Sequence, residues 1–204
     1  MVYDQATDHQ GISERHPTKP ASPYAGSKIA GENIVLSYWY AYGLPVTVVR
    51  PFNTYGPRQS ARAVIPSIIT QLLLGETELR LGSITPTRDF NYVKDTARGF
   101  FALAESDFAI GKEINIATGK EYSIEDVANI LISILNPDAI IVSDEQRLRP
   151  EASEVLRLIG DNKLIFSMTD WRPSYDLDHG LQETVTWFRR LENLSRYKSW
   201  LYNI

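Results

Sequence analysis

Residues 22–32 read SPYAGSKIAGE and open the longest helix that the sequence predicts. Ser22 is a favourable N-cap, and Pro23 is a favourable first helical residue. We expect the helix to reach Tyr42, because Gly43 supplies a stop and a proline two residues later prevents a restart. A helix of this length needs a sheet to pack on, so strands are expected near it.

Two short apolar segments predict those strands. PVTVVR, residues 45–50, is rich in β-branched residues and follows the helix directly, and EINIA, residues 113–117, is another candidate for a buried strand. Strands of this kind are typical of parallel sheets that are covered on both faces. Helices and strands alternate along the rest of the chain, which indicates an α/β fold.

Cap and turn residues predict the remaining elements. Helices are expected from about Pro66 to Gly75, from Asp95 as N-cap to about Glu105, and from the capping box SIED (123–126) to about Leu135. Asp161 is expected to cap a short helix, and Asp176 or Asp178 to cap the last one, which ends near Arg190. Strands are expected in LRLGS (79–83), RDFNYV (88–93) and AIIV (139–142). Residues 1–21 are polar and rich in proline, so we expect a loop there.

The composition excludes several classes of protein. A net charge of −4 does not suit a nucleic-acid binder, and the absence of cysteine excludes disulfides and thiolate chemistry and fits a reducing cytoplasm. His9, His16 and His179 are too scattered to predict a metal site. No apolar run is long enough for a membrane span, and the first ten residues lack a signal-peptide pattern. We therefore expect a cytoplasmic protein without a metal.

The long helix places Tyr24 and Lys28 on one face, because residues four apart are neighbours on a helix. An ammonium close to a phenol favours the phenolate, and a phenolate can take a proton from a hydroxyl. The ammonium can also donate to a ribose hydroxyl, so the spacing suits alcohol–ketone chemistry with a nicotinamide cofactor. The alternative is a surface pair without chemistry, since Tyr-x-x-x-Lys also occurs by chance.

The loop after the first strand is a second candidate for a functional segment. It reads RPFNTYGPR, residues 50–58, and begins at the carboxyl end of the predicted strand, where open α/β sheets bind their ligands. Asn53 offers both a hydrogen-bond donor and an acceptor there. The alternative is an ordinary connection from strand to helix with turn residues.

Two charged segments complete the set. In TPTRDFNYVKDT, the guanidinium of Arg88 suits a diphosphate, and the alternative is a surface pair of Arg88 with Asp89. In RLRPEASEV, Arg147 and Arg149 stand close to glutamates, and the alternative is a solvated run of charges.

Together these segments resemble one family. SPYAGSK, RPFNTYGPR, LGSITPTRDFNYVKD and RLRPEASEV are similar to motifs of the extended short-chain dehydrogenase/reductases, and among these to the NAD-dependent nucleotide-sugar epimerases and dehydratases. The resemblance extends from Tyr3 to about Arg190 and is nearest to the 4,6-dehydratases of UDP- or GDP-linked N-acetylglucosamine. It implies NAD as the cofactor and a nucleotide sugar as the substrate.

The resemblance also implies a domain organisation. The fold would be a Rossmann-like doubly wound sheet with a smaller C-terminal α/β substrate-binding domain. Residues 1–60 would be the remaining part of the NAD-binding domain. Residues 61–204 would mainly bind the nucleotide sugar, with about 85–118 returning to the Rossmann domain.

Individual residues acquire roles through the resemblance. Tyr24 resembles the acid/base that exchanges the proton of the sugar O4, and Lys28 resembles the residue that favours its phenolate and holds the nicotinamide ribose. Cofactor contacts are implied for Tyr24, Lys28, Pro51 and Phe52. Diphosphate contacts are implied for Asn53, Arg88 and Arg149, and contacts to the base or a ribose for Val64, Leu81 and Glu154.

The start of the chain departs from the family pattern. The sequence contains no G-x-x-G-x-x-G motif, which holds the NAD pyrophosphate in this family. Two or three βαβ units, about 100 residues at about 30 each, are expected before Met1. Dehydratases of the family usually carry an acidic residue at the position of Met1, and a 4-epimerase does not need it.

Three hypotheses follow. The chain is part of a nucleotide-sugar 4,6-dehydratase, part of a nucleotide-sugar 4-epimerase, or a non-catalytic fragment that binds nucleotide sugars. We expect the 204-residue chain to be inactive by itself. We also expect a homodimer of the full-length protein, since related enzymes pair through the helix that bears the tyrosine and the lysine.

Overall fold

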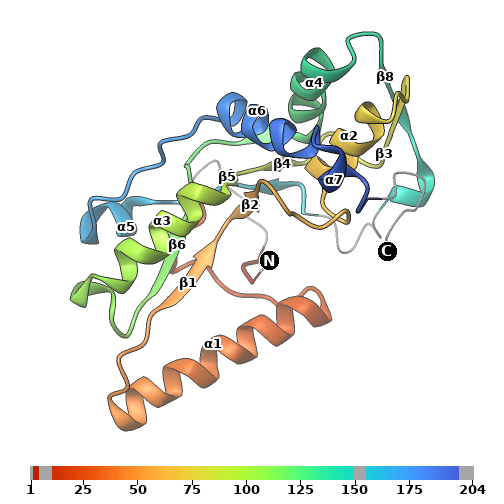
Figure 1. Cartoon of the computed structure of the whole chain (residues 1–204). Coiled ribbons are helices and arrows are strands. Elements are labelled where there is room, and N and C mark those ends of the chain that lie inside the picture. The colour runs from red at the N-terminus through yellow and green to blue at the C-terminus, as the bar shows by residue number, and fades with distance from the viewer. Residues whose placement is uncertain (1, 5–10, 149–154, 198–204) are drawn as a thin grey trace. The chain divides into compact units, whose positions relative to one another are not determined.

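The computed structural model describes residues 2–4, 11–148 and 155–197, which form an α/β protein (Figure 1). The chain divides into two compact units, each assembled from three separate segments. Unit 1 comprises Met1–Thr54, Arg88–Glu121 and Val155–Ser174, and unit 2 comprises Tyr55–Thr87, Tyr122–Glu154 and Tyr175–Ile204.

The long N-terminal helix is confirmed with its predicted bounds. Helix α1 spans Pro23–Tyr42, and the hydroxyl of Ser22 caps it by accepting the N–H of Ala25 at 3.2 Å. Gly43 ends the helix in the left-handed conformation, with φ of 67°, which a glycine adopts without steric cost. Only Ala25 and Leu36 of this helix are buried, so its packing within unit 1 is sparse.

The two strands predicted in unit 1 pair in parallel. Strands β1 (Val48–Pro51) and β6 (Glu113–Ile116) form a two-stranded sheet in which Val49 lies opposite Ile114 and Pro51 opposite Ile116. Parallel strands end at the same edge of a sheet, and ligands of α/β proteins bind there. The residues that follow the two strands, 52–53 and 117–119, therefore lie at one carboxyl edge.

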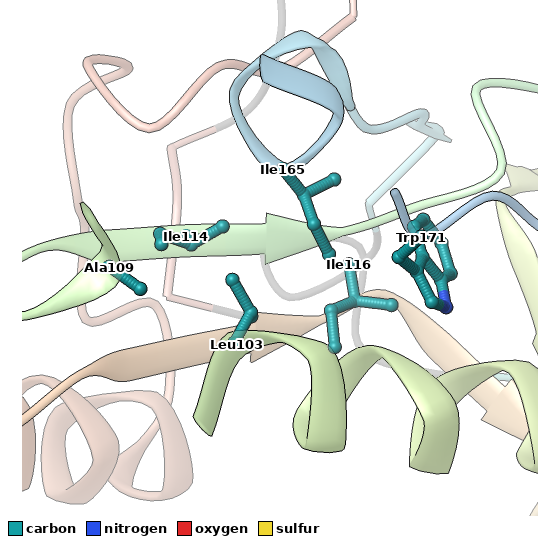
Figure 2. Packing of buried hydrophobic residues seen from close by; sticks show 6 residues of the cluster. All are labelled: Leu103, Ala109, Ile114, Ile116, Ile165 and Trp171. Atoms are coloured by element: carbon teal, nitrogen blue, oxygen red, sulfur yellow. The ribbon is translucent and has the colours of Figure 1, made fainter. Parts of the chain in front are cut away.

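A cluster of buried apolar side chains packs against this sheet (Figure 2). Helix α3 (Val93–Ala104) supplies Leu103, and the short helix α5 (Lys163–Met168) supplies Ile165, which points toward strand β6. The cluster consists of Leu103, Ala109, Ile114, Ile116, Ile165 and Trp171. Burial of such side chains is the main stabilising contribution in a domain of this kind.

Unit 2 has a parallel pair of its own. Strands β3 (Glu78–Leu81) and β8 (Ile140–Ser143) run side by side, and the side chain of Gln71 fixes Arg80 by bonding its backbone N–H and carbonyl at 3.0 and 3.3 Å. The unit also contains helices α2 (Val64–Leu73), α4 (Ile124–Leu135), α6 (Leu177–Phe188) and α7 (Leu191–Leu194). The predicted capping box of Ser123 and Asp126 is confirmed at the start of α4.

The remaining elements are short. They are β2 (Asn53–Tyr55), β4 (Thr87–Arg88), β5 (Phe90–Tyr92), β7 (Tyr122–Ser123), β9 (Arg157–Leu158), and the 3₁₀ turns η1 (Asp107–Ala109) and η2 (Glu145–Arg147). None of the helices within the described residues is both long and apolar enough to cross a membrane.

Two predicted helix caps are wrong. Asp95 does not cap α3, because the helix begins at Val93 and Asp95 lies buried in its first turn. Its carboxylate accepts the N–H and the hydroxyl of Ser174, both at 3.0 Å, and pairs with Arg98. The second error concerns α5, where Asn162 and not Asp161 is the N-cap, although the Asp161 carboxylate accepts the N–H of Lys163 at 2.8 Å.

The N-terminal loop contributes more to unit 1 than its polar composition predicts. Tyr3 and Ile12 are buried with Phe52, Ala117 and Leu158 in a second apolar cluster. Isolated β-bridges join Tyr3 to Thr18 and Ile12 to Gly160. The described part of this segment is therefore an integral part of the core.

Candidate active site

Tyr24 and Lys28 lie one turn apart near the start of α1, as predicted. The Lys28 ammonium nitrogen is 5.4 Å from the centroid of the Tyr24 ring. Tyr24 is 65% exposed and Lys28 is also exposed, so both polar groups face solvent within unit 1. The hydroxyl of Ser27 donates to the Tyr24 carbonyl at 2.8 Å, which is a local bond on the same turn. This arrangement leaves a phenol and an ammonium available to a ligand.

A buried ion pair connects the helix that carries these residues to the sheet. Glu32 lies one turn after Lys28, and its carboxylate accepts from Arg50 of β1 at 2.7 Å and, through the second guanidinium nitrogen, at 3.1 Å. The side chain of Arg50 is only 7% exposed. A two-pronged bond between planar groups fixes their relative orientation as well as their distance.

Arg50 has further partners on both sides. It bonds the Glu113 carboxylate at 2.9 Å and donates to the Tyr3 hydroxyl at 3.0 Å, and its guanidinium lies 4.9 Å from the centre of the Tyr3 ring. Burial alone would lower the pKa of Arg50, but its hydrogen bonds to Glu32 and Tyr3 outweigh this effect and raise it. Arg50 therefore stays charged.

Tyr3 is the buried end of this network. Its hydroxyl donates to the side-chain oxygen of Asn115 at 2.6 Å. Removal from water raises the pKa of Tyr3 to about 12, although the hydrogen bond from Arg50 and its positive charge oppose the change. The phenol is therefore neutral at physiological pH and acts as a structural hydrogen-bonding group.

The carboxyl edge of the β1–β6 sheet holds the next candidates. Pro51 is exposed, whereas Phe52 is buried and stacks on Tyr3 with ring centroids 6.4 Å apart. Asn53 is half-buried, and its backbone N–H donates to the carbonyl of Asp89 at 3.1 Å. The chain therefore brings Phe52 and Asn53 to one edge, next to the segment that contains Arg88.

Asp89 lies under this edge with no exposed surface. One carboxylate oxygen accepts the N–H and the hydroxyl of Thr118 at 2.9 and 2.7 Å and the amide of Asn91 at 3.2 Å. The other accepts the N–H groups of Gly119 at 2.9 Å and Gly160 at 3.2 Å. Burial raises the pKa of Asp89, and these hydrogen bonds oppose the rise. The predicted alternative of an Arg88–Asp89 surface pair is wrong, because Asp89 is buried.

The other predicted residues lie elsewhere. Arg88 ends β4 in unit 1 and is half-buried. In unit 2, Val64 is the first residue of α2 and Leu81 is the buried last residue of β3. Arg149 and Glu154 lie outside the described residues. Arg147 is not part of a solvated charge run, because it bonds Asp144 at 3.0 Å and Ser67 at 3.1 Å and is only 13% exposed.

Sequence reasoning missed Asp89, Arg50 and Glu32 as organising residues. A charged residue within a short apolar strand was the available signal for Arg50, since lone buried charges require partners. The corresponding signal for Asp89 is that this carboxylate directly precedes the apolar Phe90 in a predicted strand. Within the described part of the chain, no group of three or more His, Asp or Glu residues could hold a metal ion.

The parallel strands, the helix with Tyr-x-x-x-Lys and the polar residues at the strand ends agree with the solved Rossmann-type dehydratases and epimerases of the extended short-chain dehydrogenase/reductase class that this chain resembles. The chain belongs to the family described as GDP-mannose 4,6 dehydratase, whose family model matches residues 2–184. The human dTDP-D-glucose 4,6-dehydratase is 30% identical over 201 residues, which are 97% of this chain and 56% of that protein.

Solved structures agree with this assignment. Pal from Bacillus thuringiensis is 41% identical with a TM-score of 0.82, over 93% of this chain and 60% of that one. The UDP-glucuronic acid 4-epimerase from Bacillus cereus, in complex with UDP-glucuronic acid and NAD, is 29% identical with a TM-score of 0.84, over 93% of this chain and 59% of that one. The chain therefore spans little more than half the length of these relatives.

Proposed function

We propose that this chain is part of an NAD-dependent nucleotide-sugar 4,6-dehydratase. The reaction oxidises the sugar at C4, eliminates water across C5 and C6, and returns the hydride to C6. The observation that carries the proposal is the exposed Tyr24–Lys28 pair on a helix tied by Arg50 to the parallel sheet. Membership of a dehydratase family supports it independently.

The residues fit the nicotinamide end of NAD. The Tyr24 phenol and the Lys28 ammonium are exposed donors, and Pro51 and Phe52 follow at the carboxyl edge where a dinucleotide would lie. Tyr24 and Lys28 would hold this end of NAD, which would supply the hydride acceptor for C4 and the hydride donor for C6. Tyr24 takes the proton of the O4 hydroxyl, and the Lys28 ammonium donates to the ribose. The sequence has no glycine-rich motif for the pyrophosphate end.

The substrate side is assigned to a set of polar and apolar residues. Asn53 and Arg88 belong to adjoining segments of unit 1, and their amide and guanidinium donors suit the oxygens of a diphosphate. Val64 and Leu81 of unit 2 are assigned to the nucleotide base or its ribose. Arg149 is assigned to the diphosphate and Glu154 to a ribose on the basis of the sequence.

A nucleotide-sugar 4-epimerase is the second candidate. The solved epimerase from Bacillus cereus is 29% identical to this chain, the same identity as the solved dTDP-glucose 4,6-dehydratase DesIV from Streptomyces venezuelae. Analysis of the product of the full-length protein separates the two activities. A 4-keto-6-deoxy sugar indicates the dehydratase, and a sugar inverted at C4 with its 6-hydroxyl retained indicates the epimerase.

We also assign the roles of the two units, the cellular location and the oligomeric state. We assign unit 1 to the cofactor side and unit 2 mainly to the nucleotide side of the protein. We assign the protein to the cytoplasm, which the absence of cysteine supports. The full-length protein is a homodimer that pairs through α1, and the exposed apolar side chains Ile34, Tyr38 and Tyr42 on that helix support this assignment.

Calorimetric titration of the purified chain with UDP, dTDP and GDP, and separately with NAD, tests the proposal. We expect one of the diphosphates to bind in the absence of NAD. Arg88→Ala and Asn53→Ala should each weaken that binding by about tenfold, the effect of losing one charge-assisted or well-placed hydrogen bond. Arg80→Ala is the matched control, because Arg80 is an exposed arginine paired with Glu78 in unit 2. Failure of all three diphosphates to bind would contradict the proposal.

A further inference from the structure

We propose that Asp89 is a positioning residue that holds Asn53 and Arg88 in place for the diphosphate of the substrate. The inference rests on the proposed function, in which these two residues contact that diphosphate. Asp89 itself is fully buried. Its role would be to fix the backbone of the residues that contact the diphosphate.

The carboxylate of Asp89 joins segments that are far apart in the sequence. It accepts from Thr118 and Gly119, which follow strand β6, and from Gly160, which follows strand β9. The backbone of Asp89 adds two further bonds: its carbonyl accepts the N–H of Asn53 at 3.1 Å, and its N–H donates to the carbonyl of Leu158 at 2.7 Å. Asp89, which bonds Asn53 through its backbone, is therefore also held by the segment of Thr118 and Gly119 and by the segment of Leu158 and Gly160.

The position of Asp89 determines that of Arg88 through the chain itself. Arg88 precedes Asp89 directly, and successive side chains of an extended segment point in opposite directions. A carboxylate that is anchored inward therefore turns the neighbouring guanidinium outward. Asp89 also fixes Asn53 through the backbone hydrogen bond. One buried residue therefore positions both residues that are proposed to bind the diphosphate.

The surroundings leave this anchor little freedom to shift. Gly160 has no room for a side chain, because an added Cβ would lie 2.9 Å from the Phe52 ring and still closer to Ala117. Gly119 has φ of +73°, which only glycine adopts readily. Both glycines present their N–H groups to Asp89. The local backbone is therefore shaped around the carboxylate.

Two substitutions at Thr118 provide a sharp test. Thr118→Val keeps the shape of the side chain and removes the hydroxyl that donates to Asp89 at 2.7 Å, whereas Thr118→Ser keeps the donor. Asp89→Asn is the stronger change, because an amide nitrogen cannot accept the bonds that one carboxylate oxygen accepts. Thr184→Val is the control, since it also removes one hydroxyl donor, but the fully buried Thr184 donates to Gly180 within α6 of unit 2, whereas Thr118 is half-buried.

The readouts are the affinity for UDP by calorimetry, the thermal midpoint, and hydrogen exchange of the Asn53 backbone amide by NMR. We expect UDP to bind about tenfold more weakly to Asp89→Asn and about threefold more weakly to Thr118→Val, the range expected for a displaced or lost hydrogen bond. Thr118→Ser should restore the affinity. Thr184→Val should lower the thermal midpoint at least as much as Thr118→Val, because Thr184 is the more deeply buried of the two, and leave UDP binding unchanged.

The proposal is overturned if Thr118→Val binds UDP as the wild type does, or if Thr184→Val weakens binding equally. Asp89→Asn is used only if its thermal unfolding remains cooperative. If it does not, Thr118→Val alone tests the proposal. If the wild type binds dTDP or GDP in place of UDP, that diphosphate is the probe, and failure of all three to bind would contradict the proposed function instead. In that case, hydrogen exchange of the Asn53 backbone amide tests whether Asp89 positions Asn53. Unchanged protection in Thr118→Val overturns that role, and faster exchange supports it.

Discussion

Arg50 and Glu32 form a two-pronged buried ion pair between strand β1 and helix α1. The helix buries only Ala25 and Leu36 within unit 1, so apolar packing alone holds it weakly. The pair lies one turn beyond Lys28 and two turns beyond Tyr24, on the stripe of the helix that carries both. It therefore sets the rotation of α1 and with it the direction in which the proposed catalytic pair points.

Substitution of Arg50 should lower the free energy of unfolding. Arg50→Met leaves the mostly buried Glu32 carboxylate, 15% exposed, without its partner. Removal of one member of a fully buried pair costs about 3–5 kcal/mol of the free energy of unfolding, so we expect a loss near the lower end of this range. Arg80→Met is the control, because Arg80 and Glu78 are both more than half exposed and such pairs contribute less than about 1 kcal/mol. Urea unfolding followed by circular dichroism measures both. Equal losses in the two variants would show that the buried pair has no special role.

Gly160 should not tolerate a side chain. Gly160→Ala places a methyl group against Ala117 and the Phe52 ring, and overpacking of this kind costs about 1–3 kcal/mol. Gly31→Ala is the control: Gly31 lies within α1 and has nothing within 4 Å, so alanine should stabilise the helix by up to about 1 kcal/mol. Chemical unfolding of the two variants should give shifts of opposite sign, and a shift of the same sign would contradict the prediction.

Tyr3 should make the protein sensitive to alkali. Its folded pKa of about 12 lies above the ordinary value of 10.0, so ionisation is harder in the folded state than in the unfolded state. The contribution of the neutral phenol is complete below pH 10 and is lost as the pH rises from 10 to about 12. Two pH units correspond to about 2–3 kcal/mol.

Tyr3→Phe isolates this effect. The difference in free energy of unfolding between wild type and Tyr3→Phe should shrink as the pH rises through that range. Urea unfolding at several pH values between 9 and 12 measures it. A constant difference would mean that the Tyr3 phenol ionises as readily in the folded protein as in the unfolded chain.

The capping box of α4 predicts that the stability of the fold decreases at acidic pH. The hydrogen bonds from the Ser123 hydroxyl and N–H lower the pKa of Asp126 below its ordinary value of 3.8. A depressed pKa stabilises the fold above the unfolded value, and this contribution disappears as the pH falls through the folded value. Ser123→Ala should cost about 1 kcal/mol at neutral pH and return the Asp126 pKa toward normal.

NMR titration of the Asp126 carboxyl carbon checks the capping-box prediction in wild type and variant. Thr186→Ala is the control, because Thr186 is an exposed helical residue whose hydroxyl bonds only within its own helix. An Asp126 pKa that stays the same in Ser123→Ala would assign the shift to another cause.

Local signals predicted much of the fold. The bounds of α1, the strands β1 and β6, and the capping box of α4 followed from side chains that act within a few residues of one another. Tyr24 and Lys28 were also found in this way, because helical spacing alone brings them together.

Contacts between distant segments were not predictable in the same way. Asp95 has the sequence signature of an N-cap, but Ser174, 79 residues away, takes its carboxylate. Asp89 stands beside Arg88 in the sequence, yet its partners are Thr118, Gly119 and Gly160. Tyr3 lies in a polar segment and is buried by residues beyond position 50. Nothing in the local pattern encodes these partners.

The partners of Asp89 have a consequence for synthesis on the ribosome. Asn53 emerges well before Gly160, and the carboxylate that anchors its strand acquires its last donor only when Gly160 has left the exit tunnel. A long loop must close before this contact can form, so the step is slow compared with helix formation. Helix α1 with Tyr24 and Lys28 can therefore form during translation before the edge that holds Asn53 and Arg88 is complete.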